Sequence, residues 1–273
     1  MLPLARNFQP DTLVVSSVMP SPNFGERKNV TAPDMIVLHY TGLADAASAI
    51  SRLCTAGTEV SAHYVVFEDG NIVQCVPESA RAWHAGASSW AGDTDINSRS
   101  IGIEIVNRGH VLGYPDFPIR QTAAVIALCK GIILRREVPA HRILAHSDVA
   151  PGRKKDPGEK FPWRLLADSG VGHWVEPAPI IRSEHKMLGS SGDEVMALQE
   201  ALARYGYDVP CTGRYENRTV DVVAAFQRHF RPEQIDGVAD ASTLTTLDDL
   251  LATLPKTDRA FQLTRDGEQN RSL

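Results

Sequence analysis

The spacing of apolar residues changes along the chain, predicting strands and helices in the first two thirds and helices alone after that. Five short runs are almost wholly apolar, as expected of strands covered on both faces. These runs are residues 35–40, 64–67, 72–76, 101–106 and 143–145. An Asp69-Gly70 turn between the second and third runs predicts a hairpin. Helical spacing over 44–54 and 119–137 completes an α/β fold, with a mixed central β-sheet flanked by helices.

The last third of the chain shows three apolar stripes at helical spacing, which predict three short helices around one small core. The stripes are Val195, Leu198, Leu202 and Tyr205; Val223, Phe226 and Phe230; and Leu244, Leu247, Leu251 and Leu254. We expect a first domain over residues 1–178, whose residues 1–33 form an extended arm punctuated by prolines. A linker over 179–191, a three-helix domain over 192–255 and a polar tail over 256–273 follow.

Length and charge narrow the class of protein. At 273 residues the chain exceeds one average domain, and its 43% hydrophobic and 22% charged residues are typical of a soluble globular protein. A net charge of -5 argues against nucleic acid and anionic membrane surfaces as partners. No run approaches the ~20 apolar residues of a membrane span, and the N-terminus lacks the pattern of a secretory signal. The sequence alone predicts a cytoplasmic monomer without a transmembrane segment.

The four cysteines show no readable chemistry. Cys54, Cys75, Cys129 and Cys211 lack Cys-x-x-Cys spacing, so neither a thiolate zinc site nor a redox pair is indicated. Cys54 and Cys129 fall on apolar helix faces and are expected to be small buried hydrophobic side chains. The sequence leaves open whether any pair forms a disulfide.

The densest chemistry lies in residues 141–163. His146 follows the fifth apolar run, and a loop rich in Pro and Gly then returns Asp156. Zinc accepts His and Asp together, and His39, near the end of the first apolar run, is the candidate third ligand. Three protein ligands with a fourth position left to water is the arrangement of a catalytic zinc. For each residue alone, a hydrogen-bonded or surface His and a turn Asp are the commoner alternatives.

Two further stretches contain candidate functional side chains: a carboxylate within an apolar strand, and a loop with two Trp residues. Glu104 lies in an apolar strand on the same face as Gly102, where a carboxylate is costly unless it meets a cation or acts chemically. On this pattern alone, an ion-paired structural Glu is favoured over a catalytic base. The loop from Trp83 to Trp90 is either a substrate-facing wall or a loop pinned by its Trp side chains.

Taken together, these stretches resemble, in order, the sequence blocks of the zinc-dependent N-acetylmuramoyl-L-alanine amidases of type 2, the AmpD- and AmiD-like enzymes. The blocks are Val37-Leu-His-Tyr-Thr41, Ser61-Ala-His-Tyr64, Trp83-His-Ala-Gly86, Ser100-Ile-Gly-Ile-Glu-Ile-Val-Asn107, Ala145-His-Ser-Asp148 and Arg153-Lys-Lys-Asp-Pro-Gly158 with Phe161-Pro-Trp163. Residues 192–237 resemble the peptidoglycan-binding type 1 module, a three-helix repeat, although residues 230–237 replace a shorter link. Six blocks in order make the first resemblance specific.

The resemblance implies a fold shared with peptidoglycan-recognition proteins, a cofactor and a reaction. It implies Zn²⁺ held by His39, His146 and Asp156, with Glu104 as the catalytic base. Lys154, two residues before the third ligand, would stabilise the developing oxyanion. The bond cut would be the amide between the lactyl group of N-acetylmuramic or anhydromuramic acid and L-alanine, so the partners are peptidoglycan or muropeptide fragments.

The resemblance also implies a set of substrate-binding residues around the metal. They are Tyr40, His63, Trp83, His84, Asn97 and Arg99. Among them, His63 resembles a family residue that supports the site without ligating the metal. The C-terminal module argues for polymeric peptidoglycan and a place in the cell envelope or periplasm. The missing secretory signal argues for soluble muropeptides in the cytoplasm.

Three other interpretations predict different outcomes. A non-catalytic peptidoglycan-recognition protein would lose a zinc ligand, whereas this chain keeps all three and Glu104. A Ser or Cys hydrolase with His146 as base would need a nucleophile, and the chain has no Gly-x-Ser-x-Gly turn. A purely structural zinc would need a fourth ligand, for which His63 is the nearest candidate. Metal analysis and sensitivity to chelators distinguish these interpretations. A separate alternative is that Lys155, and not Lys154, is the cation that stabilises the oxyanion.

Overall fold

The computed structural model describes residues 8–181 and 185–255. By contacts along its backbone the chain divides into two compact units, Met1–His173 and Trp174–Leu273. Each unit is described by itself below.

Several predicted segments fall wholly or partly outside the described residues. These are the tail at 256–273, the first seven residues of the arm and residues 182–184 of the linker. The domain boundaries proposed at residues 178 and 191 stay predictions. Ala178, the last residue of the predicted first domain, lies within the second unit as the backbone contacts divide the chain. Its backbone makes hydrogen bonds with the hydroxyl groups of Ser242 and Thr246 of that unit.

The first unit is built on a six-stranded sheet with the strand order β1-β5-β4-β7-β3-β8. The strands are β1 (Ser17–Val18), β3 (Met35–Tyr40), β4 (Tyr64–Val66), β5 (Ile72–Gln74), β7 (Ser100–Ile105) and β8 (Ile143–Ala145). Strands β4, β7, β3 and β8 run parallel, and β5 returns antiparallel to β4 through the predicted hairpin. The predicted mixed sheet is therefore confirmed, and its four parallel strands end at one edge.

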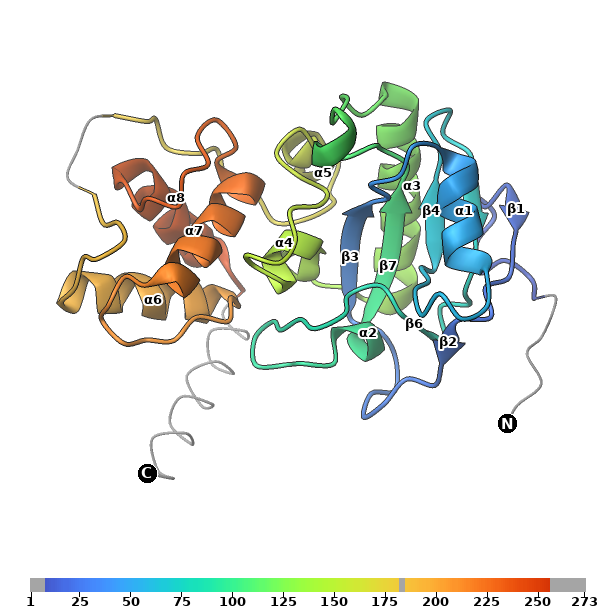
Figure 1. The fold of residues 1–273 in the computed structure, drawn as a ribbon, viewed down its shortest axis with the longest axis horizontal. Helices are drawn as coiled ribbons and strands as arrows, with labels where there is room; N and C mark the ends of the chain where they lie inside the picture. Colours follow the sequence, from blue (N-terminus) through green and yellow to red (C-terminus); the bar gives the residue numbers. More distant parts are fainter. Residues whose placement is uncertain (1–7, 182–184, 256–273) are drawn as a thin grey trace. The chain divides into compact units, whose positions relative to one another are not determined.

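Helix α1 (Ala46–Cys54) covers one face of this sheet, in front of it in Figure 1. It begins at Asp45, whose carboxylate accepts a hydrogen bond from a backbone N–H of the first turn, satisfying one donor that a helix start leaves unpaired. Its side chain Leu53 packs in one apolar cluster with Val65 and Val73 of the sheet. The apolar stripe read from the sequence is thus the buried face of α1.

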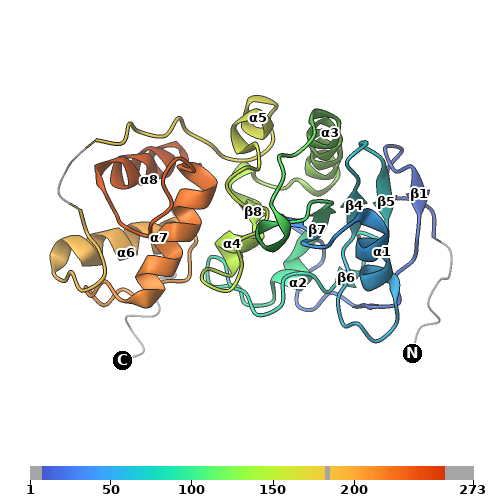
Figure 2. The same ribbon diagram turned by 45° about the horizontal axis from the view of Figure 1, so that its top comes forward.

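Helix α3 (Ile119–Arg136) covers the opposite face, so the sheet lies between the two helices (Figures 1 and 2). The side-chain amide of Gln121 donates hydrogen bonds to the carbonyls of Val66 and Val106, which ties the helix to two strand ends. The helix ends at the left-handed Glu137, two residues before Pro139, which cannot continue a helix. The buried side of α3 carries Val125, Leu128, Cys129 and Ile132.

The described part of the arm is extended and is fixed to the first unit along its length. Strand β1 adds to the sheet beside β5, and β2 (Phe24–Gly25) pairs with β6 (Arg81–Ala82) in a separate two-stranded sheet. The Asn23 amide donates to carbonyls around the end of α1, and the Arg27 guanidinium donates to carbonyls that include those of Glu78 and Ser100. These acceptors are backbone carbonyls of neighbouring loops and strand ends. The arm therefore fixes the main chain of these segments by hydrogen bonds, in addition to side-chain packing.

Several short elements escape the periodicity analysis. They are α2 (Ile96–Arg99), α4 (His146–Val149), α5 (Trp163–Asp168) and the 3₁₀ turns η1 (His110–Leu112) and η2 (Ala140–Arg142). Each has between three and six residues, which is too short to show a helical repeat. The loop that begins at Trp83 accordingly contains a bridge between Trp90 and Asp93 and leads into α2.

The second unit contains the three predicted helices, α6 (Asp193–Tyr205), α7 (Asn217–Phe230) and α8 (Ala241–Thr253). The predicted apolar stripes supply most of its core, where Leu202 and Phe226 are fully buried. Within the described residues of the whole chain, none of the helices combines the length and the apolar character that a membrane span needs.

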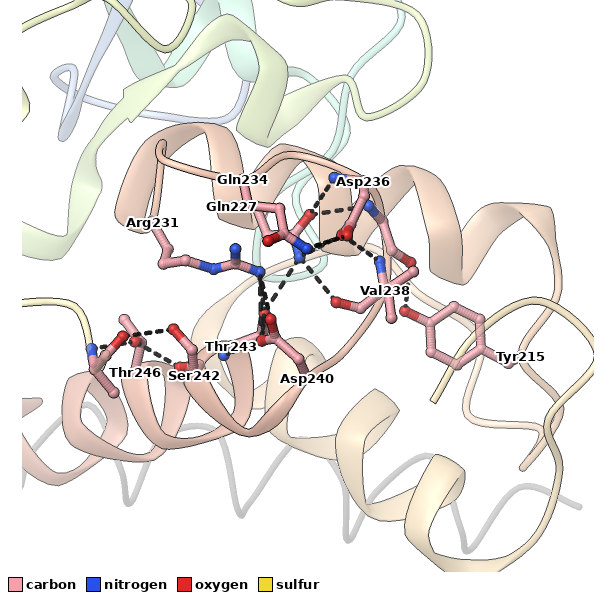
Figure 3. Close-up of polar contacts among 12 residues, drawn as sticks. Tyr215, Gln227, Arg231, Gln234, Asp236, Val238, Asp240, Ser242, Thr243 and Thr246 are labelled. Atoms are coloured by element: carbon pink, nitrogen blue, oxygen red, sulfur yellow. Dashed lines mark hydrogen bonds and ion pairs between the residues drawn. The ribbon is translucent and has the colours of Figure 1, made fainter. Parts of the chain in front are cut away.

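Two glutamines repeat one hydrogen-bonding pattern in this unit. The side-chain oxygen of Gln199 accepts from the backbone N–H groups of Thr212 and Gly213, and Gln227 accepts in the same way from Asp236 and Gly237. The amide nitrogen of Gln199 donates to the carbonyl of Arg214 and to the hydroxyl of Thr219 in α7. The amide nitrogen of Gln227 donates in the same way to the carbonyl of Val238 and to the hydroxyl of Thr243 in α8. Figure 3 shows the second of these networks. A helix, a glutamine-held turn and the next helix therefore form a unit that occurs twice.

The long link after α7 is held by the same network. Arg231 is almost fully buried, and its guanidinium donates to the Thr243 hydroxyl at 2.7 Å and lies 3.4 Å from the Asp240 carboxylate (Figure 3). Asp240 in turn caps α8 by accepting from the Thr243 backbone N–H. The unusual length of residues 230–237 is thus accommodated by buried polar contacts.

Replacing Gln227 with Leu is expected to destabilise the second unit by about 2 kcal/mol, because buried backbone donors lose their acceptor. Hydrogen exchange of the α7 and α8 amides measures this change in the full chain. Gln234→Leu is the matched control, since Gln234 is exposed and its side-chain amide donates to the exposed carboxylate of Asp236. Equal exchange rates in the two variants would contradict the structural role of Gln227.

Candidate active site

Three adjacent parallel strands bring their carboxyl ends to one edge of the first unit's sheet. His39 in β3 lies opposite Glu104 in β7, and Leu38 lies opposite Ala145, the last residue of β8. His146 comes next, directly after the strand, and begins α4. These side chains therefore meet at the edge where open α/β sheets place their ligands.

His39, His146 and Asp156 converge on one point. His39 Nδ1 lies 2.9 Å from His146 Nδ1 and 3.1 Å from Asp156 Oδ2, and His146 Nδ1 lies 2.9 Å from the same oxygen. All three residues are buried, with 1%, 2% and 6% of their surfaces exposed. The structure thus brings together the three predicted ligands, and they form a group that could hold a metal ion.

The donor atoms suit a divalent metal. His146 Nε2 lies 3.0 Å from the carbonyl oxygen of Ala85, which can only accept, so Nε2 carries the ring proton and Nδ1 presents a lone pair. This lone pair faces the carboxylate of Asp156, an arrangement that a cation between the two groups would stabilise. Ligand atoms around a tetrahedral zinc with bonds of about 2.0–2.1 Å lie roughly 3.3 Å apart, close to the spacing seen here.

Burial and mutual contacts shift the protonation of these groups. Burial lowers the pKa of His39 to about 4, with His146 adding to the effect and Asp156 opposing it. Burial alone would raise the pKa of Asp156, but His146 and His39 outweigh it and hold this pKa below its usual range. At neutral pH the cluster therefore contains a neutral His39 and a charged carboxylate, the forms that bind metal.

Glu104 faces the same space from the neighbouring strand. Its Oε2 is buried and has no hydrogen-bond partner among the described residues. Burial raises the pKa of Glu104 well above its usual value, the charge of Asp156 raises it further, and Lys154 lowers it. The ion-paired structural role that the strand pattern favoured is not what the structure shows, because no salt bridge holds Glu104 within the described part of the chain.

A cavity of about 520 Å³ opens over these groups. Glu104, His39, His146 and Asp156 line it, together with both candidate cations, Lys154 and Lys155. Lys154 is half-buried and acts electrostatically on Glu104 and His39, whereas Lys155 is exposed. This difference in placement favours Lys154 as the cation that faces the reacting groups.

Three of the predicted substrate-binding residues, Tyr40, Trp83 and His84, also line the cavity. The Tyr40 hydroxyl lies 3.0 Å from His110 Nδ1, and His110 is itself a lining residue that the sequence did not single out. Trp90, by contrast, is 1% exposed and lies in the core. Each of the two interpretations of this loop therefore applies to one Trp residue. Trp83 faces the cavity, and Trp90 anchors the loop in the core.

The other three predicted substrate-binding residues, His63, Asn97 and Arg99, are absent from the described cavity lining and lie behind it. His63 is fully buried, accepts from the Gly102 backbone N–H at Nδ1 and contacts the Ala80 carbonyl at Nε2. Burial, aided by Arg27, lowers its pKa to about 3. The structure therefore gives His63 the supporting position that the resemblance implied.

Asn97 and Arg99 make their contacts in the walls of the site. The Asn97 side-chain oxygen accepts from the backbone N–H groups of His84 and Ala85, which fixes the loop that carries both. Arg99 forms ion pairs with Asp34 and Asp93. Direct contact of either side chain with a substrate stays a prediction that this geometry does not favour.

Sequence reasoning also missed Arg153, a cavity residue whose guanidinium donates to the carbonyls of Ala85 and Ala87. Only its place beside the Lys154-Lys155 pair could have drawn attention to it. The described lining contains no cysteine, and its serine is Ser61. That hydroxyl already donates to the Asn23 carbonyl and accepts from the Trp83 backbone N–H, which argues against a Ser or Cys nucleophile.

Acidification is expected to destabilise the metal-free protein between pH 6.5 and about 4. His39 and His63 stay neutral in the folded chain, with pKa values of about 4 and about 3, whereas in the unfolded chain they take up protons near pH 6.5. Each such group removes about 1.4 kcal/mol per pH unit across this window. Urea unfolding in EDTA at pH 7 and pH 5 measures the effect. Equal or greater stability at pH 5 would contradict these assignments.

Comparison with known proteins agrees with this geometry. The family described as N-acetylmuramoyl-L-alanine amidase matches residues 29–159, and the family described as putative peptidoglycan binding domain matches residues 191–247. The amidase AmiD of Escherichia coli is 39% identical over 236 residues, which cover 80% of this chain and 82% of AmiD. The 1,6-anhydro-N-acetylmuramyl-L-alanine amidase AmpD of Citrobacter freundii is 35% identical over 53% of this chain and 84% of AmpD.

Solved structures show the same relationship. The E. coli AmiD structure superposes with a TM-score of 0.70 at 36% identity, covering 84% of this chain and 97% of AmiD. The AmpDh3 structure from Pseudomonas aeruginosa superposes with a TM-score of 0.68 at 32% identity, covering 86% of this chain and 95% of AmpDh3. The resemblance drawn from six sequence blocks is thus confirmed, and the chain belongs to the N-acetylmuramoyl-L-alanine amidases, hydrolases of the amide bond between the muramic acid and L-alanine.

Proposed function

We propose that the chain hydrolyses this amide with a zinc ion held by His39, His146 and Asp156. The observation that carries the proposal is the convergence of two imidazole nitrogens and a carboxylate oxygen beside an unpartnered Glu104, in one cavity. When bound, zinc would supply Lewis acidity that polarises the scissile carbonyl and lowers the pKa of a bound water to about 7. No fourth His, Cys or acid joins the group within the described residues, which favours a catalytic over a structural metal.

Glu104 is the proposed general base and acid. Its raised pKa increases its affinity for the proton that the attacking water must lose. The same carboxyl group can then pass that proton to the nitrogen of the departing L-alanine. An amine leaves poorly unless it is protonated, so one residue serves both steps.

Lys154 is the proposed partner of the oxyanion. As the carbonyl carbon becomes tetrahedral, its oxygen gains negative charge, and a half-buried ammonium group is worth more there than in water. Lys155 lines the same cavity but is exposed, so solvent screens its charge more strongly.

The substrate is proposed to be a muropeptide with an anionic stem peptide. Four cations line the cavity, Arg52, Arg153, Lys154 and Lys155, against two acids, Glu104 and Asp156. The AmiD structure contains anhydro-N-acetylmuramic acid-L-Ala-D-γ-Glu-L-Lys, and AmpDh3 has been solved with an anhydromuramic pentapeptide. Trp83 offers an aromatic face for the sugar or the peptide plane.

The second unit is proposed to hold the enzyme on wall polymer, which would raise the local substrate concentration. This role favours polymeric peptidoglycan as a substrate beside soluble fragments. The expected monomeric state stays a prediction.

Glu104→Gln is expected to lower kcat by about 10²–10⁴-fold while leaving zinc content unchanged, because the proton acceptor is lost but no ligand is. Mass spectrometry of the lactyl sugar and free L-Ala peptide released from an anhydro-muropeptide gives the rate, and elemental analysis gives the zinc. Wild-type rates in this variant would exclude Glu104 as the base.

Lys154→Ala is expected to lower kcat by about 10²–10³-fold, since a charge facing the oxyanion is removed. Lys155→Ala is the matched control and should stay within a factor of a few of the wild type, measured with the same muropeptide. The assignment is wrong if the two variants exchange these outcomes.

A further inference from the structure

His84 makes contacts that the proposed chemistry does not require of a substrate-binding residue. Its Nδ1 lies 3.0 Å from Nε2 of His39, and its Nε2 lies 3.1 Å from the Ser100 hydroxyl oxygen. The His84 and His39 rings meet edge to face, with centroids 5.0 Å apart. His84 thus lies between a proposed metal ligand and the first residue of β7.

The backbone sets the direction of this chain of hydrogen bonds. The Ser100 hydroxyl donates to the carbonyl oxygen of Ile96 at 2.6 Å, and a carbonyl can only accept. Having used its proton, the hydroxyl can only accept from His84, so the single ring proton of a neutral His84 lies on Nε2. His84 Nδ1 is then an acceptor, and the group that donates to it is His39 Nε2–H.

The consequence reaches the proposed metal position. With its proton held on Nε2, His39 presents a bare Nδ1 toward Asp156 Oδ2 and His146 Nδ1. His146 reaches the same state more directly, because its Nε2 contacts the carbonyl of Ala85. Both imidazoles are therefore oriented with a lone pair inward, one by a backbone carbonyl and the other through two intervening side chains.

The sheet leaves a space for the intermediate ring. A Cβ added to Gly102 would lie 2.4 Å from Cγ of His84, far closer than atoms can approach. Gly102 lies two residues after Ser100 and two residues before Glu104 in β7, so all three positions are on the same face of the strand. The glycine in this strand therefore admits the His84 ring between the base and the serine, a close approach that a side chain would block.

We propose that His84 and Ser100 are positioning residues that fix the tautomer of His39, so that its Nδ1 is always available to the metal. The proposal rests on the proposed zinc site and deepens it, since it assigns a role to two residues outside the ligand set. Groups that orient a ligating imidazole in this way typically change metal affinity by 10–100-fold when they are removed.

Zinc affinity, measured by competition with a chromogenic chelator, tests the proposal without using activity. His84→Leu should weaken zinc binding by about 10–100-fold. His84→Asn should recover much of the loss, because its side-chain oxygen can take the position of Nδ1. Ser100→Ala should weaken binding by about 3–10-fold, the effect of one neutral hydrogen bond.

Ser147→Ala is the matched control for the serine. Ser147 lies next to His146, and its hydroxyl is buried without a hydrogen-bond partner among the described residues. Removing it should leave zinc affinity unchanged. The double variant His84→Leu/Ser100→Ala should bind zinc no more weakly than His84→Leu, because the serine acts only through the histidine.

A second readout separates positioning from a general loss of structure. In the zinc-loaded protein, two-bond ¹H–¹⁵N spectra of the histidine rings should show His84 protonated at Nε2. Protonation at Nδ1 would overturn the proposal, and so would additive losses in the double variant. If His84→Leu fails to fold by circular dichroism, Ser100→Ala and the ring spectra still decide. A wild type that fails to bind zinc would instead remove the proposed function itself.

Discussion

Two imidazole nitrogens and a carboxylate oxygen lie within 3.1 Å of one another in a buried position, and this juxtaposition is the constraint around which the first unit is arranged. Lone pairs and negative charge packed together away from water repel each other, and a divalent cation is the simplest group that stabilises them. Strand register fixes His39 beside Glu104, and β8 delivers His146 to the same edge. The loop that follows returns Asp156, so three distant parts of the chain meet.

The surrounding structure keeps this arrangement from relaxing. Backbone carbonyls, which cannot change their hydrogen-bonding sense, orient one histidine directly and start the chain of contacts that reaches the other. The same loop that carries His84 and Ala85 is held by the side chain of Asn97 and by Arg153. The arm adds further backbone contacts through Asn23 and Arg27. Rigidity at a site of this kind is supplied largely by polar contacts to main-chain atoms.

The sequence predicted the long elements because they have periodicity to detect. Runs of buried residues gave the central strands, and helical stripes gave α1, α3 and the three helices of the second unit. The short elements, among them α2 and α4, lack a full repeat and were missed. Residue type and position made His39, His146 and Asp156 candidate ligands, but the resemblance was needed to expect that they converge, because no local pattern reports that three separated segments share one edge.

Side-chain direction was the least predictable feature of the site. The family resemblance implied that His63, Asn97 and Arg99 bind substrate, yet whether a residue faces the cavity or its supporting wall depends on neighbours from other strands and loops. Gly102 illustrates the difficulty. The sequence showed that Gly102 and Glu104 share one face of the strand, but it did not show that the His84 ring occupies the space that a side chain at Gly102 would need. The pairing of Trp83 with the cavity and Trp90 with the core was likewise decided by tertiary packing.

Zinc K-edge X-ray absorption of the protein loaded with one equivalent of metal tests the central claim most directly. The account predicts a single tightly held ion with nitrogen and oxygen neighbours at about 2.0–2.1 Å and no sulfur neighbour near 2.3 Å. In an Asp156→Ala variant the ion should be held less tightly, so the spectrum should shift from this low-coordinate shell toward that of hydrated zinc. A sulfur shell, or a wild-type spectrum that the Asp156 substitution leaves unchanged, would contradict it.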